Sequence, residues 1–111
     1  MAEIAITRTD SQSLIKLAVK LTAVEAPALQ AALKQEIAAG SRTIVFDLRA
    51  TTTLDSTGIG LLIATSNTLA TMQGAIRLQN VAPDILKLLQ HMRLADRLHA
   101  TATATGEANR G

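Results

Sequence analysis

The chain of 111 residues is predicted to fold as one α/β domain, with a mixed sheet of four to five strands and about three main helices. Three observations predict this class. Strand-like and helix-like segments follow one another in the order ββαβαβα, which implies crossover connections between neighbouring strands. Residues 43–48 are almost continuously apolar, as is typical of a central strand covered on both faces. Apolar types reach 48% but aromatic types only 1%, so the core is aliphatic, built around Phe46.

The first two strands are expected to form a hairpin. Ile4 and Ile6 alternate with smaller or polar residues, and residues 10–13 have the composition of a turn. The second strand is predicted to run on without a break, its apolar side chains alternating with Lys16, Ala18 and Lys20. The alternating apolar residues are Ile15, Leu17, Val19 and Leu21.

The first helix follows this hairpin. Pro27 suits a first helical turn, where a missing N–H has no intrahelical partner anyway. Leu29, Leu33 and Ile37 recur every four residues and predict the buried stripe, and Gly40 ends the helix.

The second half alternates in the same way. After the strand over residues 43–48 we expect a loop to residue 54, a helix over about 57–72 that ends before Gly74, and a strand over 75–79. Pro83 opens the last helix, whose apolar residues are Ile85, Leu86, Leu88, Leu89 and Met92. The pattern leaves open a final strand around residues 98–103. We expect a single domain over residues 1–111, ordered over about 3–100, with a frayed tail from residue 101.

Composition excludes several classes of protein. Cysteine is absent, which removes disulfides, thiol nucleophiles and cysteine-ligated metals, and the lack of aromatic residues argues against a nucleic-acid platform. The longest run of apolar residues and glycine covers only 58–64, too short to span a membrane, and no leader pattern is seen, so we expect a cytoplasmic protein. The net charge is +2 and the basic residues are scattered; the densest group has the composition of a solvated surface. That group is Lys87, His91, Arg93, Arg97 and His99.

Charge is missing from one long stretch. Between residues 50 and 76 only Asp55 is charged. Helical geometry puts Ile59, Leu62 and Ile63 on the core face and leaves an opposite face without charge, made of Thr57, Leu61, Ala64 and Thr68. This face is either covered by the protein's own domain or is a docking surface for a partner protein.

The start of that helix, residues 54–60, reads Leu-Asp-Ser-Thr-Gly-Ile-Gly. Asp55 or Ser56 is an ordinary N-cap. Gly58 and Gly60 need another reason, since glycine in a helix costs up to about 1 kcal/mol against alanine. They make sense where another backbone or a nucleotide approaches closely. A hydroxyl here could also carry a phosphate, because the helix N-terminus favours anions.

Enzyme motifs fit this segment poorly. A nucleophile elbow requires glycine two residues before the serine, where the chain has Leu54, and a P-loop requires lysine after Gly60, where it has Leu61. No second Asp-Ser/Thr-Gly motif supplies an aspartic-protease partner, and no metal-ligand spacing is present. We therefore expect no catalytic residue, cofactor or metal; a small hydrolase or phosphotransferase using Ser56 or Asp55 is the least favoured alternative.

The strand at 43–48, the segment Leu-Asp-Ser-Thr-Gly-Ile-Gly and the uncharged helix resemble the STAS domain, and more narrowly the bacterial anti-sigma factor antagonists. The resemblance extends over about residues 4–100 and includes Asn-Val-Ala-Pro at 80–83 and Leu-Ala-Asp-Arg-Leu at 94–98. It implies the STAS fold and a regulatory switch that is not an enzyme.

In that family the serine of this motif is phosphorylated by a partner that is both an anti-sigma factor and a serine kinase, with a histidine-kinase-like ATPase fold. A PP2C-type phosphatase reverses the modification. The resemblance thus implies that Ser56 is the phospho-acceptor and that the partner surface contains Asp55, Thr57, Gly58, Ile59, Leu61 and Thr22. The lack of aromatic residues and of a membrane-length apolar run predicts no direct contact with nucleic acid or membrane.

Three positions depart from the family pattern. Thr22 stands where the family usually has an aspartate near the phospho-site, Val19 replaces a glycine of the same motif, and Arg93 replaces a glycine before Leu94. The loss of the aspartate favours an alternative function, a STAS adaptor that is not phosphorylated and docks on a transporter ATPase or a multiprotein scaffold.

Overall fold

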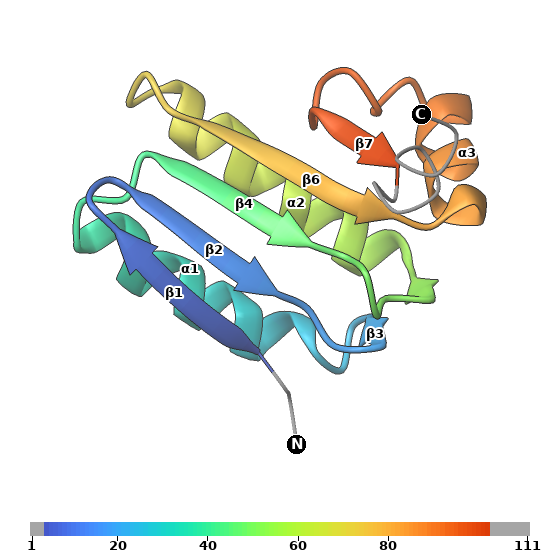
Figure 1. Cartoon of the computed structure of the whole chain (residues 1–111), viewed down its shortest axis with the longest axis horizontal. Helices are drawn as coiled ribbons and strands as arrows, with labels where there is room; N and C mark the ends of the chain where they lie inside the picture. The colour runs from blue at the N-terminus through green and yellow to red at the C-terminus, as the bar shows by residue number, and fades with distance from the viewer. Residues whose placement is uncertain (1–3, 103–111) are drawn as a thin grey trace, which may run out of the picture.

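A computed structural model describes residues 4–102 and shows a five-stranded mixed sheet with two helices packed on one side and the third helix beside the edge strand Ala100–Ala102 (Figure 1). The five strands lie in the order β1-β2-β4-β6-β7. They are β1 (Ala5–Thr9), β2 (Gln12–Lys16), β4 (Thr43–Asp47), β6 (Ala75–Val81) and β7 (Ala100–Ala102). Only the β1–β2 pair is antiparallel; β2, β4, β6 and β7 are mutually parallel. The predicted α/β class, the mixed sheet and the hairpin are confirmed.

Three helices make the crossovers. They are α1 (Ala26–Ala38), α2 (Ser56–Ala70) and α3 (Pro83–His91). The stripe predicted for α1 holds, with Leu29 and Leu33 buried and Ile37 half-buried, and Gly40 follows the helix in the left-handed region at φ 111°. At the end of α2 the left-handed residue is Gln73, at φ 62°, so the helix does not end through the backbone freedom of Gly74. Gly74 is needed for a different reason: a Cβ there would lie 2.1 Å from the carbonyl oxygen of Arg42.

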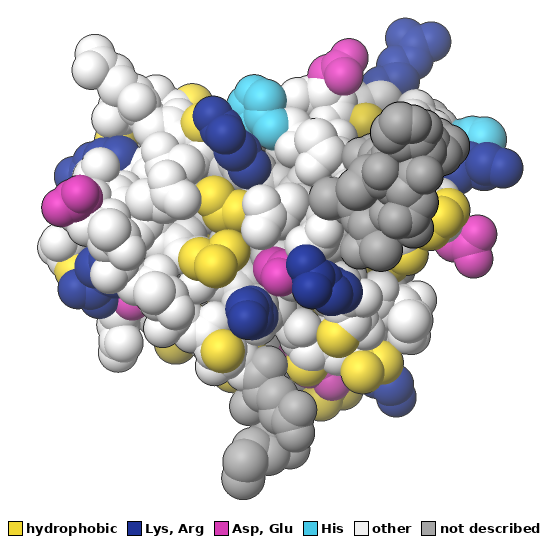
Figure 2. Space-filling view, in the orientation of Figure 1, with side chains coloured by type: hydrophobic (Ala, Val, Ile, Leu, Met, Phe, Trp, Pro, Cys, Tyr) yellow, Lys and Arg dark blue, Asp and Glu magenta, His cyan; other side chains and the backbone are white. Residues whose placement is uncertain are grey.

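The core lies between the sheet and the helices. Phe46, the fourth residue of β4, is fully buried, as predicted for the residue around which the aliphatic core is built. Its neighbours in register are Ile15 on β2 and Leu78 on β6, both fully buried. The open face of the sheet carries basic and acidic side chains that are spread among uncharged ones, without one continuous basic patch (Figure 2).

The segment after β2 differs from the prediction. A single strand over residues 15–21 is wrong: β2 ends at Lys16, and a separate two-residue strand, β3 (Lys20–Leu21), pairs in parallel with β5 (Thr53–Leu54). Val19 is 52% exposed, so the predicted alternation fails there. Its carbonyl oxygen instead accepts hydrogen bonds from the N–H groups of Thr52 and Thr53, at 2.9 and 3.1 Å. The expected loop over residues 49–54 therefore contains a strand, which ties the entry of α2 to the entry of α1.

The end of the chain also needs one correction. The strand left open around residues 98–103 exists as Ala100–Ala102, in which Ala100 and Ala102 pair with Leu78 and Val81 of β6, so Thr101 and Ala102 lie in a strand and not in a frayed tail. The remainder of the predicted tail, residues 103–111, lies outside the described residues.

Candidate functional site

The candidate site is the N-terminus of α2, where Ser56 is the first helical residue and its side chain is exposed. The preceding Asp55 is the N-cap, as predicted for this position: its Oδ1 accepts a hydrogen bond from the N–H of Gly58 at 2.9 Å. Asp55 has extended backbone angles, φ −106° and ψ −177°, as expected for a residue that precedes the helix. Thr57 is exposed beside Ser56.

The carboxylate of Asp55 also reaches outside its own helix. Its Oδ2 accepts a hydrogen bond from the N–H of Ala23, in the loop between β3 and α1, at 3.1 Å. The hydrogen bond from Gly58 first, and then that from Ala23, hold the pKa of Asp55 below its usual value. Asp55 is therefore ionised at neutral pH, and Ser56 follows it directly in the chain.

The two glycines of the motif lie in different environments. Gly58 is buried, and a Cβ there would lie 2.3 Å from the carbonyl oxygen of Leu21 in β3. The backbone that approaches this glycine is thus the protein's own. Gly60 is exposed, and a Cβ there would meet nothing within 4 Å. Packing within the described residues accounts for Gly58 and gives no reason for Gly60.

Thr22, where the family pattern has an aspartate, is half-buried in the loop that Asp55 contacts. Its N–H and its hydroxyl both donate to Oε1 of Glu25, at 2.9 and 2.6 Å. These bonds, the one from the hydroxyl first, lower the pKa of Glu25. A carboxylate is therefore present in this loop, three residues after the position where the sequence pattern looks for it.

On the uncharged face of α2, Thr57 is exposed at the start of the helix, whereas Leu61 lies beside α1. Leu61 is half-buried and, with Ala64 and Thr68, borders a hollow of about 180 Å³ against Leu33 and Ile37 of α1. Helix α1 packs beside that flank of the helix, so Leu61 does not point freely into solvent. Of the two explanations left open for this face, cover by the protein's own domain holds for Leu61. Ile59 is buried in the core, as its predicted face requires.

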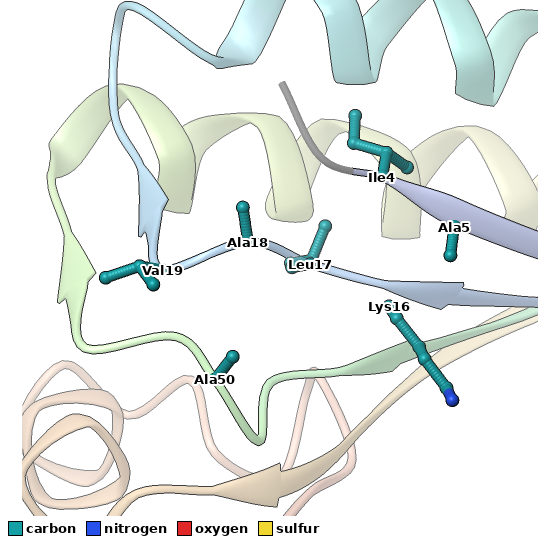
Figure 3. A pocket seen from close by; sticks show the side chains of 7 residues that line it. All are labelled: Ile4, Ala5, Lys16, Leu17, Ala18, Val19 and Ala50. Atoms are coloured by element: carbon teal, nitrogen blue, oxygen red, sulfur yellow. The ribbon is translucent and has the colours of Figure 1, made fainter. Parts of the chain in front are cut away.

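A second hollow, of about 400 Å³, lies where the chain leaves β2 (Figure 3). Its lining is Ile4, Ala5, Lys16, Leu17, Ala18, Val19 and Ala50. Figure 3 shows that Lys16, its one charged residue, extends away from Ile4 and Leu17. Since no polar groups converge here, the hollow offers no chemistry. In the described part of the chain, no three His, Asp or Glu residues are grouped to hold a metal, and no helix is long and apolar enough to cross a membrane.

Comparisons with known proteins agree with this architecture. The family model described as the STAS domain matches residues 3–108. No curated protein sequence is significantly similar to the chain.

Solved structures share the fold at low sequence identity. The Bacillus cell fate determinant SpoIIAA in its phosphorylated form is 18% identical, with a TM-score of 0.73 over 98% of this chain and 100% of that one. An anti-sigma factor antagonist from Mycobacterium paratuberculosis is 21% identical, with a TM-score of 0.80 over 99% and 93%. A putative anti-sigma factor antagonist from Thermotoga maritima is 14% identical, with a TM-score of 0.82 over 96% and 92%.

Proposed function

The chain belongs to the STAS domain family, and from this premise we propose that it is an anti-sigma factor antagonist switched by phosphorylation of Ser56. Unmodified, it binds an anti-sigma serine kinase of the histidine-kinase-like ATPase fold in the cytoplasm and thereby frees a sigma factor. Once phosphorylated, it is released, and a PP2C-type phosphatase restores the hydroxyl. Its role is regulatory, without catalysis of its own.

One observation carries this proposal: the exposed Ser56 hydroxyl at the first residue of α2, beside an ionised Asp55. The kinase transfers the γ-phosphoryl group of ATP to the Ser56 oxygen, the proton of the hydroxyl is released, and ADP leaves. The helix N-terminus tolerates the new anion, since its N–H groups and dipole favour negative charge. A bound partner does not, because about −1.5 to −2 charges then stand next to the charge of Asp55.

The accessible part of this surface consists of Ser56, Thr57 and Gly60, with Asp55 and Thr22 half-buried at its edge. Gly58 and Ile59 are buried, so their contribution is to set the position of α2 and not to touch the partner. Leu61 belongs to the proposed partner surface as part of the wall of the hollow between α1 and α2. Gly60 supports this arrangement because its missing side chain lets a partner's backbone come close.

The test starts from each purified small ATPase of this kinase class encoded in the same genome, incubated singly with the chain and ATP. We expect one of them to add a single phosphate, seen as an increase in intact mass. Ser56→Ala abolishes the increase, and the neighbouring Thr57→Ala, as matched control, retains it. Loss of the phosphate in Thr57→Ala instead would contradict the assignment of Ser56.

Binding of the same kinase separates the two functions that the sequence leaves open. We expect Ser56→Asp to weaken binding by about tenfold or more, since it puts a permanent charge at the site. An unphosphorylated adaptor would bind equally well with serine or aspartate at position 56. Tight binding unchanged by Ser56→Asp, without phosphate transfer, refutes the switch.

A further inference from the structure

The Asp55 carboxylate does more than cap a helix. A cap requires one acceptor oxygen, and Oδ1 fulfils that role toward Gly58. Oδ2 accepts from the N–H of Ala23, which lies 32 residues earlier in the chain. The loop between β3 and α1 is thereby attached to the start of α2.

This loop is a compact turn with an apolar tip. The Val24 N–H donates to the Thr22 hydroxyl at 3.2 Å, and the N–H groups of Glu25 and Ala26 donate to the Thr22 carbonyl oxygen at 3.1 and 2.9 Å. With its backbone held in this way, the loop presents Val24, which is 83% exposed. The other exposed large apolar residues of the described chain reach at most 52%; they are Ile6, Val19, Met72, Leu88 and Met92.

Val24 and Ser56 are linked through the hydrogen bond that joins their chain neighbours, Ala23 and Asp55. Each is the chain neighbour of one member of the bonded pair Ala23–Asp55, so its Cα lies about 3.8 Å from the Cα of that member. An apolar side chain this exposed on a fixed loop gains about 1.5 kcal/mol or more, equivalent to about tenfold in affinity, when a partner buries it.

We infer that Asp55 is a positioning residue, which holds the β3–α1 loop so that Val24 and the Ser56 hydroxyl form one surface for the anti-sigma kinase. The inference rests on the proposed function and adds a specific contact to it: the partner has an apolar pocket for Val24 beside the groups that receive Ser56. Asp55 acts through Ala23, so its replacement loosens the loop and displaces Val24 from that pocket.

The substitution Asp55→Ser isolates this role. A serine at the N-cap still accepts a hydrogen bond from the first turn, but it has one oxygen and a shorter reach, so the bond to Ala23 is lost. In the free protein we expect amide exchange at Ala23 to become about tenfold faster or more, whereas the middle of α2 keeps its protection. Unchanged exchange at Ala23 overturns the positioning role without any partner being present.

Binding to the kinase identified above gives the second readout. We expect Val24→Ser to weaken binding about tenfold, at an unchanged melting temperature because the side chain is exposed. The control is Met72→Ser, 40% exposed and beyond the opposite end of α2, about 22 Å away for a helix of 15 residues. It leaves the affinity unchanged.

A double-mutant cycle tests the dependence of one residue on the other. If Asp55 acts by holding Val24, then Asp55→Ser combined with Val24→Ser weakens binding about as much as either alone, about tenfold. Losses that multiply to about a hundredfold show two independent contacts and overturn the inference. If the wild-type chain binds no kinase of this class, the proposed function fails and the inference fails with it. If it binds and Val24→Ser binds equally well, the inference alone is refuted.

Discussion

The two glycines at the start of α2 allow a matched experiment, because they lie two residues apart in one helix and differ in what surrounds them. In Gly58→Ala the new Cβ would lie 2.3 Å from the Leu21 carbonyl oxygen and 2.9 Å from its Cγ. Carbon–oxygen contacts this short do not persist, so α2 and β3 must separate by about 1 Å, an overpacking strain that typically costs 1–3 kcal/mol. The oxygen belongs to the backbone, so no side-chain rotation relieves the contact.

The expected difference in stability can be worked through for both variants. Alanine in place of glycine favours a helix by about 1 kcal/mol, and in Gly60→Ala nothing opposes this gain. In Gly58→Ala the strain outweighs it, and the separation also weakens the hydrogen bond from Asp55 N–H to Leu21 O, which is already 3.4 Å long. We expect Gly58→Ala to lose about 1–2 kcal/mol and Gly60→Ala to gain about 0.5–1 kcal/mol.

Urea unfolding followed by circular dichroism measures both free energies, and the melting temperatures should differ by about 10 °C in a domain of this size. Equal stability of the two alanine variants would refute the claim that Gly58 is required by the approach of β3. Kinase binding adds a second comparison: we expect the more stable Gly60→Ala to bind more weakly. A variant that is both more stable and equally tight would show that no partner approaches Gly60.

Two further predictions concern groups away from Ser56. Glu36 is buried and accepts hydrogen bonds from Arg8 at 2.9 Å and Ser13 at 2.6 Å, which lower its pKa to about 2. A depressed carboxyl pKa stabilises the fold above the unfolded value of about 4.5, and this contribution disappears as the pH falls toward 2. We therefore expect the free energy of unfolding of the wild-type chain to fall by about 2 kcal/mol between pH 5 and pH 2, a figure reduced because Arg8 is half-exposed. Glu36→Gln should not show this fall. Parallel pH curves for the two proteins would contradict the prediction. In Leu61→Asp a charge enters the apolar wall between α1 and α2, so we expect thermal unfolding to show a loss of stability of about 1–3 kcal/mol. An unchanged melting temperature would show that Leu61 does not pack against α1.

Much of the fold was accessible from local patterns. The stripe of α1, the buried run that becomes β4 and the Asp55 cap depend on residues within a few positions of one another, and all three are confirmed. The prediction of a continuous strand through Val19 is wrong, because apolar residues go on alternating with other residues in the sequence beyond Lys16, where β2 ends. The pairing of β3 with β5 interrupts it, and such pairing joins segments more than thirty residues apart.

The candidate site divides in the same way. The sequence by itself determined that an uncharged helix starts at an Asp-Ser pair, since capping and charge are local properties. Only the tertiary structure decided which glycine is needed for packing, that Leu61 lies against α1, and that Oδ2 of Asp55 holds the loop carrying Val24. Each of these facts depends on two elements brought together by the β3–β5 pair or by the packing of α1 on α2. No periodicity along the chain records such a contact, because the contacting residues are distant in sequence and each is locally unremarkable.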